Sequence, residues 1–246
     1  MNGWQQILQY LALILSGEAI FLLPFVIPRV FRNTMLVVYE IDNIDLGYCF
    51  SVYGIIAIFS YFFGGPLADV VPARKLMSGA LILTALGGVG IAYFPSYNSL
   101  LVAYGFWGFS TIFLFWAALM KSTRILVARE DEAKAFGWVE GGRGLSSALW
   151  ASMAVLLFNW FFLEEALDLS ASRNMAYRNV LLACSVILLL VAIFIFFILP
   201  KQEPGTDIDH SMGDLRKLLK KPGIWLQASI VFLAYCGYKV TDDPSL

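Results

Sequence analysis

Apolar runs of about 20 residues dominate this sequence, and they restrict the possible fold more than any other feature. A run of this length crosses the ~30 Å hydrocarbon layer of a bilayer as an α-helix. Hydrophobic residues make up 59% of the 246 residues and charged residues only 14%, whereas about a quarter of a soluble domain is charged. The sequence therefore predicts an all-α integral membrane protein, and its net charge of −1 argues against a nucleic-acid partner.

Seven apolar segments are predicted to span the membrane. They are residues 7–30, 46–66, 76–95, 99–120, 135–163, 177–199 and 223–243. The connectors 67–75, 121–134 and 200–222 carry eleven Lys and Arg residues, against four on the opposite side, which are Arg29, Arg32, Arg173 and Arg178. Because positive residues concentrate in cytoplasmic loops, we expect the N-terminus and the 200–222 connector to be cytoplasmic.

The long connector divides the chain into three predicted parts. Residues 1–199 form a six-helix transmembrane domain, 200–222 a cytoplasmic linker, and 223–246 the start of a second domain. In the linker, Leu215, Leu218 and Leu219 lie at helical spacing beside a basic face, which predicts a short helix on the inner leaflet. Six helices, a linker and a seventh helix are typical of the front end of a 6+6 transporter, so we expect most of the second half to be missing.

Residue types that carry most enzymatic chemistry are scarce. The three cysteines are scattered and the single histidine is His210, so we expect no metal site and no cofactor. The sequence has no Gly-x-x-x-x-Gly-Lys phosphate loop, and one histidine outside the spans leaves no Ser/His/Asp set in the membrane. Neither an enzyme nor an ATP-driven subunit is predicted.

The connector between the second and third spans carries a recognisable motif. Residues 64–75 read GGPLADVVPARK, and this stretch resembles the signature of the major facilitator superfamily. Six positions fit and three depart from it: Gly65, Leu67, Ala68, Asp69, Arg74 and Lys75 against Val70, Pro72 and Ala73. The resemblance implies a bundle of two three-helix repeats that works by alternating access, with a gating loop made by Gly65, Asp69, Arg74 and Lys75. The alternative is a cytoplasmic turn with solvated charges.

Other stretches extend the resemblance over the whole chain. GEAIFLLPF, FWAALMKSTR, AFGWVEGGRG and CGYKVTDD look like a bacterial branch of inner-membrane permeases whose substrates are poorly defined, nearest to carriers of sugar acids or organic anions. The family's fourth-span signature has an arginine four residues before a glycine. Here Leu101 and Tyr104 occupy that position before Gly105 and Gly108, which argues against a drug exporter.

Glu18 is a carboxylate near the middle of the first span, where a charge costs roughly 2.5–3.5 kcal/mol on insertion scales. Three interpretations remain open: it carries a coupling proton, it pairs with a buried Arg or Lys, or it is solvated in a water-filled cavity. On a helical wheel Phe25, Arg29 and Arg32 fall within about 40° of it. If the helix is continuous, one stripe leads from an extracellular basic mouth to this carboxylate.

The fifth span contains FGWVEGGRG at 136–144. Gly137, Gly141 and Gly144 share one face, which predicts close helix packing. Glu140 and Arg143 are within pairing reach of each other on the adjacent face. They form either a structural ion pair or a substrate and gating pair, and the planar fork of arginine suits a carboxylate or phosphate.

Four candidate site residues remain. Tyr53 and Trp116 are predicted to line the path of the solute. Lys239 and Asp242 are predicted to form a gate or binding element near the outer end of the seventh span. The sequence thus predicts a secondary transporter of a small polar solute, expected to be an anion such as a sugar acid, sugar phosphate or organic anion. Its transport would be coupled to protons or to a counter-solute. The alternative is a truncated, non-transporting fragment or a membrane interaction partner that needs the missing half or a second copy.

Overall fold

The computed structural model describes residues 3–126, 131–162, 168–201 and short stretches between 221 and 233. The chain separates into two compact units, residues 1–204 and 205–246. In the second unit the described residues are exposed and mostly helical, and the Ser229 hydroxyl donates to the Trp225 carbonyl at 2.8 Å. The predicted linker helix at 215–219, Lys239 and Asp242 lie outside the described residues, as does most of the predicted seventh span.

All regular elements that the structure describes in the first unit are helices, which confirms the predicted all-α membrane fold. In chain order they are α1 Gly3–Ala19, η1 Leu22–Val26, α2 Ile27–Val30, α3 Arg32–Tyr39, α4 Asn43–Val70, α5 Ala73–Tyr93, α6 Tyr97–Gly108, η2 Phe109–Trp116, α7 Ala117–Ile125, α8 Glu132–Phe161 and α9 Leu169–Ile198. Here η1 and η2 are π-helical segments. Among the described residues, five helices are long and apolar enough to cross a membrane, and the bent run from Trp4 to Val30 brings the number to six if it is counted as one span.

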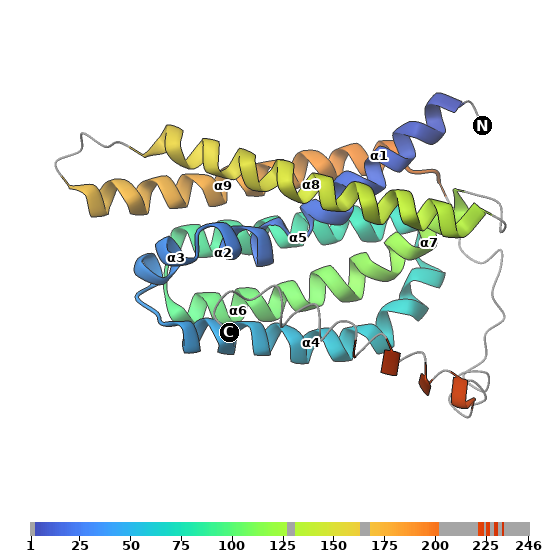
Figure 1. Ribbon diagram of the computed structural model, residues 1–246, viewed down its shortest axis with the longest axis horizontal. Coiled ribbons are helices and arrows are strands. Elements are labelled where there is room, and N and C mark those ends of the chain that lie inside the picture. The colour runs from blue at the N-terminus through green and yellow to red at the C-terminus, as the bar shows by residue number, and fades with distance from the viewer. Residues whose placement is uncertain are drawn as a thin grey trace. The chain divides into compact units, whose positions relative to one another are not determined.

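The long helices of the first unit lie side by side as a bundle (Figure 1). The N-terminus, the α4–α5 turn and the end of α7 lie at one end of this bundle, and the α3–α4 and α5–α6 turns lie at the other. The charge count predicts that the first is the cytoplasmic end, and we call the second the outer end. Helices α5 and α9 pack extensively on each other.

The first span is broken, so the continuous helix that the helical wheel assumes is not present. α1 ends at Ala19, a π-helical turn follows at Leu22–Val26, and the two parts are bent by 40°. Pro24 and Pro28 lie on the far side of the break, and proline cannot donate the backbone hydrogen bond that a continuous helix needs. The stripe from Glu18 to Arg32, which was predicted for a continuous helix, therefore loses its basis, although Arg29 still interacts electrostatically with the Glu18 carboxylate.

Helix ends also differ from the predicted boundaries. α4 continues to Val70 and α5 begins at Ala73, so the predicted connector at 67–75 is helical apart from its central turn. α9 begins at Leu169, where the Asp168 carboxylate accepts hydrogen bonds from the N–H groups of Ser170 and Ala171. The hydrogen bonds from the Ser170 hydroxyl and from these N–H groups hold the pKa of Asp168 below its ordinary value.

Glycines bring the helices together at positions that the sequence pattern did not indicate. A Cβ added to Gly108 would lie 2.7 Å from the Tyr53 carbonyl oxygen, so α6 and α4 meet there backbone to backbone. A Cβ on Gly142 would lie 2.7 Å from Ile14, which marks the contact of α8 with α1. Gly137, Gly141 and Gly144 are exposed and have no neighbouring atom within 4 Å of such a Cβ. The predicted packing face is therefore wrong within this unit, because it points away from the other described helices.

Candidate functional site

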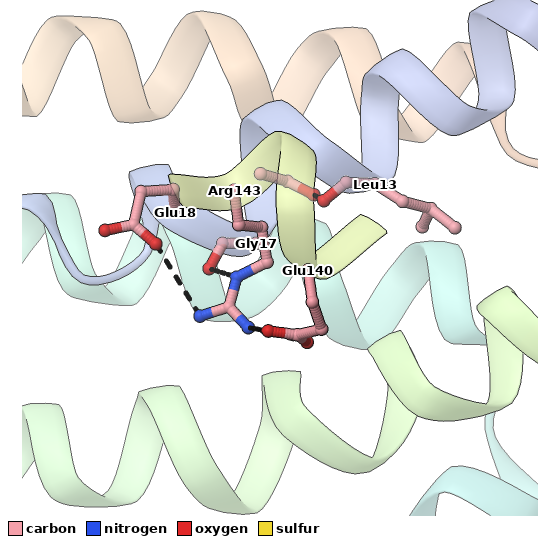
Figure 2. Close-up of polar contacts among 6 residues, drawn as sticks. Leu13, Gly17, Glu18, Glu140 and Arg143 are labelled. Atoms are coloured by element: carbon pink, nitrogen blue, oxygen red, sulfur yellow. Dashed lines mark hydrogen bonds and ion pairs between the residues drawn. The ribbon is translucent and has the colours of Figure 1, made fainter. Parts of the chain in front are cut away.

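Arg143 on α8 is the centre of a charged cluster inside the bundle (Figure 2). Its Nη1 donates to both carboxylate oxygens of Glu140, at 2.9 and 2.8 Å, and its Nη2 lies 3.6 Å from the nearer carboxylate oxygen of Glu18 on α1. Its Nε donates to the Gly17 carbonyl at 3.1 Å. The guanidinium thus connects two helices that are far apart in the sequence.

Residue 17 is a glycine, and the absence of a side chain there makes this arrangement possible. A Cβ added to Gly17 would lie 2.9 Å from Cδ of Arg143 and 3.2 Å from its Nε. Real Cβ atoms essentially never come within 3.0 Å of another group, so any larger residue at position 17 would force the arginine to move. Gly17 therefore gives Arg143 both the space to lie against α1 and a carbonyl to bind.

Burial differs sharply among the three charged side chains. Arg143 and Glu18 expose only 13% and 14% of their side chains, whereas Glu140 exposes 51%. The Ser147 side chain also hydrogen bonds to the Glu18 carboxylate, and Arg29 interacts with it electrostatically. The cluster of Glu18, Glu140 and Arg143 contains two carboxylates and one guanidinium, so it is negative when both acids are ionised.

Aromatic rings cover the guanidinium. The Arg143 Cζ lies 5.2 Å from the ring centre of Trp116 and 5.8 Å from that of Phe21, and these two rings are 6.1 Å apart. Both distances are within the range of a cation–π interaction. Phe21 also contacts Phe25, whose ring meets that of Tyr53 edge-on at 4.9 Å. Trp116 therefore touches the charged cluster directly, whereas Tyr53 is two rings away.

Two other predicted site residues take structural partners. The Tyr53 hydroxyl is 2.7 Å from the Thr111 hydroxyl and is buried in the contact between α4 and η2. Arg32 is at the outer end, where its Nε donates to the Asn43 side chain at 3.0 Å. Arg29 is exposed on α2. The structure thus brings together Glu18, Glu140, Arg143 and Trp116, but not Arg32 or Tyr53.

The signature residues lie at the cytoplasmic end of α4 and the start of α5. Gly65 and Asp69 are within the last turns of α4, Lys75 is exposed, and the Arg74 guanidinium lies 5.0 Å from the Phe196 ring centre. The structure does not test their gating role, which stays a prediction.

Lys121 is a polar residue of this region whose partner the sequence did not reveal. Its Nζ donates to the carbonyl oxygens of Ala68 at 2.8 Å and of Asp69 at 3.5 Å. The last carbonyls of a helix lack partners within the helix and attract cations, so Lys121 holds the end of α4. One indication of this contact is present in the sequence: Lys121 follows directly after the fourth apolar run, at the same end of the bundle as the signature motif.

The Arg143 cluster is the part of the described ranges whose side-chain chemistry best suits a polar solute. Among those residues no three His, Cys, Asp or Glu side chains come together as a metal site would require. The guanidinium can hold an anion, and the carboxylates can hold a proton or a cation.

Comparisons with known proteins agree with this architecture. The sequence profile of the Major Facilitator Superfamily matches residues 10–240. The chain is 29% identical over 233 residues to the Inner membrane protein YihN of Escherichia coli (strain K12), covering 92% of this chain and 53% of that protein. It is 26% identical over 205 residues to the Inner membrane protein YqcE of the same organism, covering 81% of this chain and 46% of that protein.

The chain thus spans about half the length of the curated relatives it matches. Both relatives are named as inner membrane proteins, and the described part of the chain has five or six helices that are long and apolar enough to cross a bilayer. The predicted location, a multi-pass protein of the inner membrane, is therefore confirmed.

Proposed function

This chain belongs to the major facilitator superfamily, and we propose that it supplies the solute-binding cluster of a secondary transporter for a small anionic solute. A sugar acid, a sugar phosphate or another organic anion is the class of solute that fits. The family implies transport rather than enzymatic catalysis. In the complete transporter, two six-helix halves would rock around a midplane site, with the second half coming from further sequence or from a second copy. The buried contact between Glu18 and Arg143 is the observation that carries this proposal.

The donors of Arg143 are not equally available to a solute. Nε is bound to the Gly17 carbonyl and Nη1 to Glu140, while Nη2 faces Glu18 at the longer distance of 3.6 Å. A guanidinium has five N–H donors in a rigid fork, so the Nη2 group is where a carboxylate or phosphate would enter. Glu18 therefore competes with an incoming anion for the same side of the arginine.

Charge balance supports coupling of this anion to a proton. Two ionised carboxylates around one guanidinium repel a third anion. A proton on Glu18 removes one negative charge and weakens its hold on Nη2. Glu18 is better suited to this role than Glu140, because Glu140 is half exposed and makes the shorter contacts. We infer that proton and anion bind together, which would make the complete protein a proton–anion symporter.

The aromatic rings would keep the arginine in place while its partners change. Phe21 and Trp116 lie within cation–π distance of Arg143, and this attraction does not use its N–H donors. The guanidinium can therefore exchange Glu18 for a solute without losing all of its contacts. The same rings exclude water from one side of the site, which strengthens its electrostatic interactions.

The test begins with binding and continues with uptake. A thermal-shift panel of sugar acids, sugar phosphates and dicarboxylates on the detergent-purified chain identifies ligands. Uptake of these ligands is then measured, with and without a pH gradient, in vesicles of cells that express the chain together with its second half. We expect Glu18→Gln to retain binding and to lose the stimulation by the gradient. Glu40→Gln, which removes an exposed carboxylate on the chain after α3, should behave as the wild type.

Two results would contradict the proposal. Uptake by Glu18→Gln that still responds fully to the gradient would remove the proton role of Glu18. If the wild type binds no member of the panel, the Arg143 cluster is not a binding site for this class of anion.

A further inference from the structure

A cavity of about 420 Å³ opens at the outer end of the bundle, away from the Arg143 cluster. It lies between α3, the last turn of α5 and the first turns of α9, and its lining includes Tyr39, Ile91, Tyr93, Asn174, Tyr177 and Arg178. None of these residues belongs to the proposed solute site. The cavity therefore needs a separate explanation.

The deep wall of this cavity is preformed and apolar in character. Tyr39 and Tyr177 expose only 4% and 1% of their surface, and their rings meet edge-on at 6.3 Å. The Tyr39 hydroxyl already donates to the Ile91 carbonyl at 2.9 Å. This part of the wall offers mainly ring and aliphatic surface, which suits hydrocarbon better than a polar solute.

The position of Arg178 along α9 places the cavity at the membrane surface. α9 has 30 residues, Leu169–Ile198, and the stretch from 179 to 198 has no charged residue. At about 1.5 Å per residue that stretch covers ~30 Å, the thickness of the hydrocarbon layer. Arg178, which precedes it directly and is exposed, therefore lies at the level of the lipid phosphates.

We propose that this cavity binds one anionic phospholipid, with its phosphate at Arg178 and its glycerol and first acyl carbons against the apolar wall. Arg178 is the charged residue among those that line the cavity, so the site is complementary to a negative headgroup. The Asn174 amide, one helical turn away along α9, provides a second donor for phosphate or ester oxygens. A phospholipid matches both the apolar wall and the cationic rim, whereas a water-soluble anion matches only the rim.

Native mass spectrometry of the full chain, titrated with dioleoyl-phosphatidylglycerol in detergent, tests this site. Arg178→Gln should weaken retention of the lipid about five-fold, since one basic residue near anionic lipids contributes about this factor. Ala171→Phe, which places a ring in the cavity from an exposed position, should also weaken it. Arg173→Gln removes an equal charge from the same helix at a residue outside the lining and should retain the lipid as the wild type does.

Circular dichroism spectra and melting curves are measured for each variant as a control for correct folding. Equal retention by Arg178→Gln and Arg173→Gln would overturn the proposal, as would equal retention of dioleoylglycerol, which has no phosphate. Binding of inorganic phosphate that competes with the lipid would place a soluble anion at the rim and would also count against a lipid site. These outcomes are independent of solute uptake, so the two proposals fail separately.

Discussion

Two carboxylates contact Arg143, and we predict that the more distant one is coupled to it more strongly. Glu140 is closer, at 2.8 Å, but its side chain is 51% exposed, and exposed ion pairs contribute roughly 0.2–1 kcal/mol. Glu18 is 3.6 Å away and 14% exposed. With an effective dielectric constant of about 20, Coulomb's law gives ~4–5 kcal/mol for this pair before desolvation is subtracted. Measured couplings within such networks are about 0.5–3 kcal/mol, so we expect about 2–3 kcal/mol for Glu18.

Two double-mutant cycles measure this difference. The first combines Glu18→Gln with Arg143→Gln, and the second combines Glu140→Gln with Arg143→Gln. The free energy of unfolding of the full chain is obtained in detergent micelles from the loss of helical circular dichroism on denaturation. Replacing Arg143 also removes its cation–π interactions, but this effect is common to both cycles and cancels, since each cycle isolates one pair.

The result that would refute this reasoning is specific. If the coupling of Glu140 to Arg143 equals or exceeds that of Glu18, distance rather than burial controls the cluster. Glu18 would then be only weakly held by the arginine. The proposed competition between Glu18 and an incoming anion would lose its energetic basis.

Two further predictions concern the bundle around the site. Gly108→Ala should destabilise the chain by about 1–3 kcal/mol, because its Cβ would lie 2.7 Å from the Tyr53 carbonyl oxygen and the backbone cannot move aside easily. Gly90→Ala, whose Cβ would meet no atom within 4 Å, is the control and should be tolerated. Equal melting temperatures for the two variants would contradict the close approach of α6 to α4. Lys121→Gln should speed amide exchange in the last turn of α4 by about two- to five-fold, since a cation at a helix C-terminus contributes roughly 0.3–1 kcal/mol. Lys75→Gln, which removes an exposed lysine, is the control and should leave this exchange unchanged. Unchanged amide exchange in Lys121→Gln would show that Lys121 does not hold this helix end.

The sequence predicted the spans of the first unit well because apolar run length depends directly on membrane thickness. Their ends were less predictable. α4 continues to Val70 past the apolar run, and hydropathy carries no signal for a helix that extends into water. There, the carbonyls at the end of α4 are held by Lys121, a tertiary contact that local sequence does not show.

The site shows a similar division. Glu18 and Arg143 stood out because charges in a membrane span are costly, but their contact depends on how α1 and α8 pack and on the space left by Gly17. The wheel through Arg29 and Arg32 does not apply, because a π-helical turn changes the phase of the helix by an amount that a fixed 100° step does not include. The face of Gly137, Gly141 and Gly144 meets none of the other helices described in the first unit, because periodicity shows which residues share a face but not what that face contacts.

Tyr104 shows how the structure accounts for a departure from the family pattern. It stands at one of the two positions where the fourth-span signature would have arginine, and it is fully buried. Its hydroxyl donates to the Pro24 carbonyl at 3.1 Å, and its ring lies edge-on to Phe50 and Trp107 at 5.2 Å. An unpaired carbonyl in the membrane costs several kcal/mol, and Pro28, four residues further on, has no N–H to donate to the Pro24 carbonyl. An arginine here would bring a charge among aromatic rings, whereas tyrosine satisfies the broken backbone and packs against those rings. The signature position therefore stabilises the bend of the first span, and that bend sets the course of the chain immediately after Glu18.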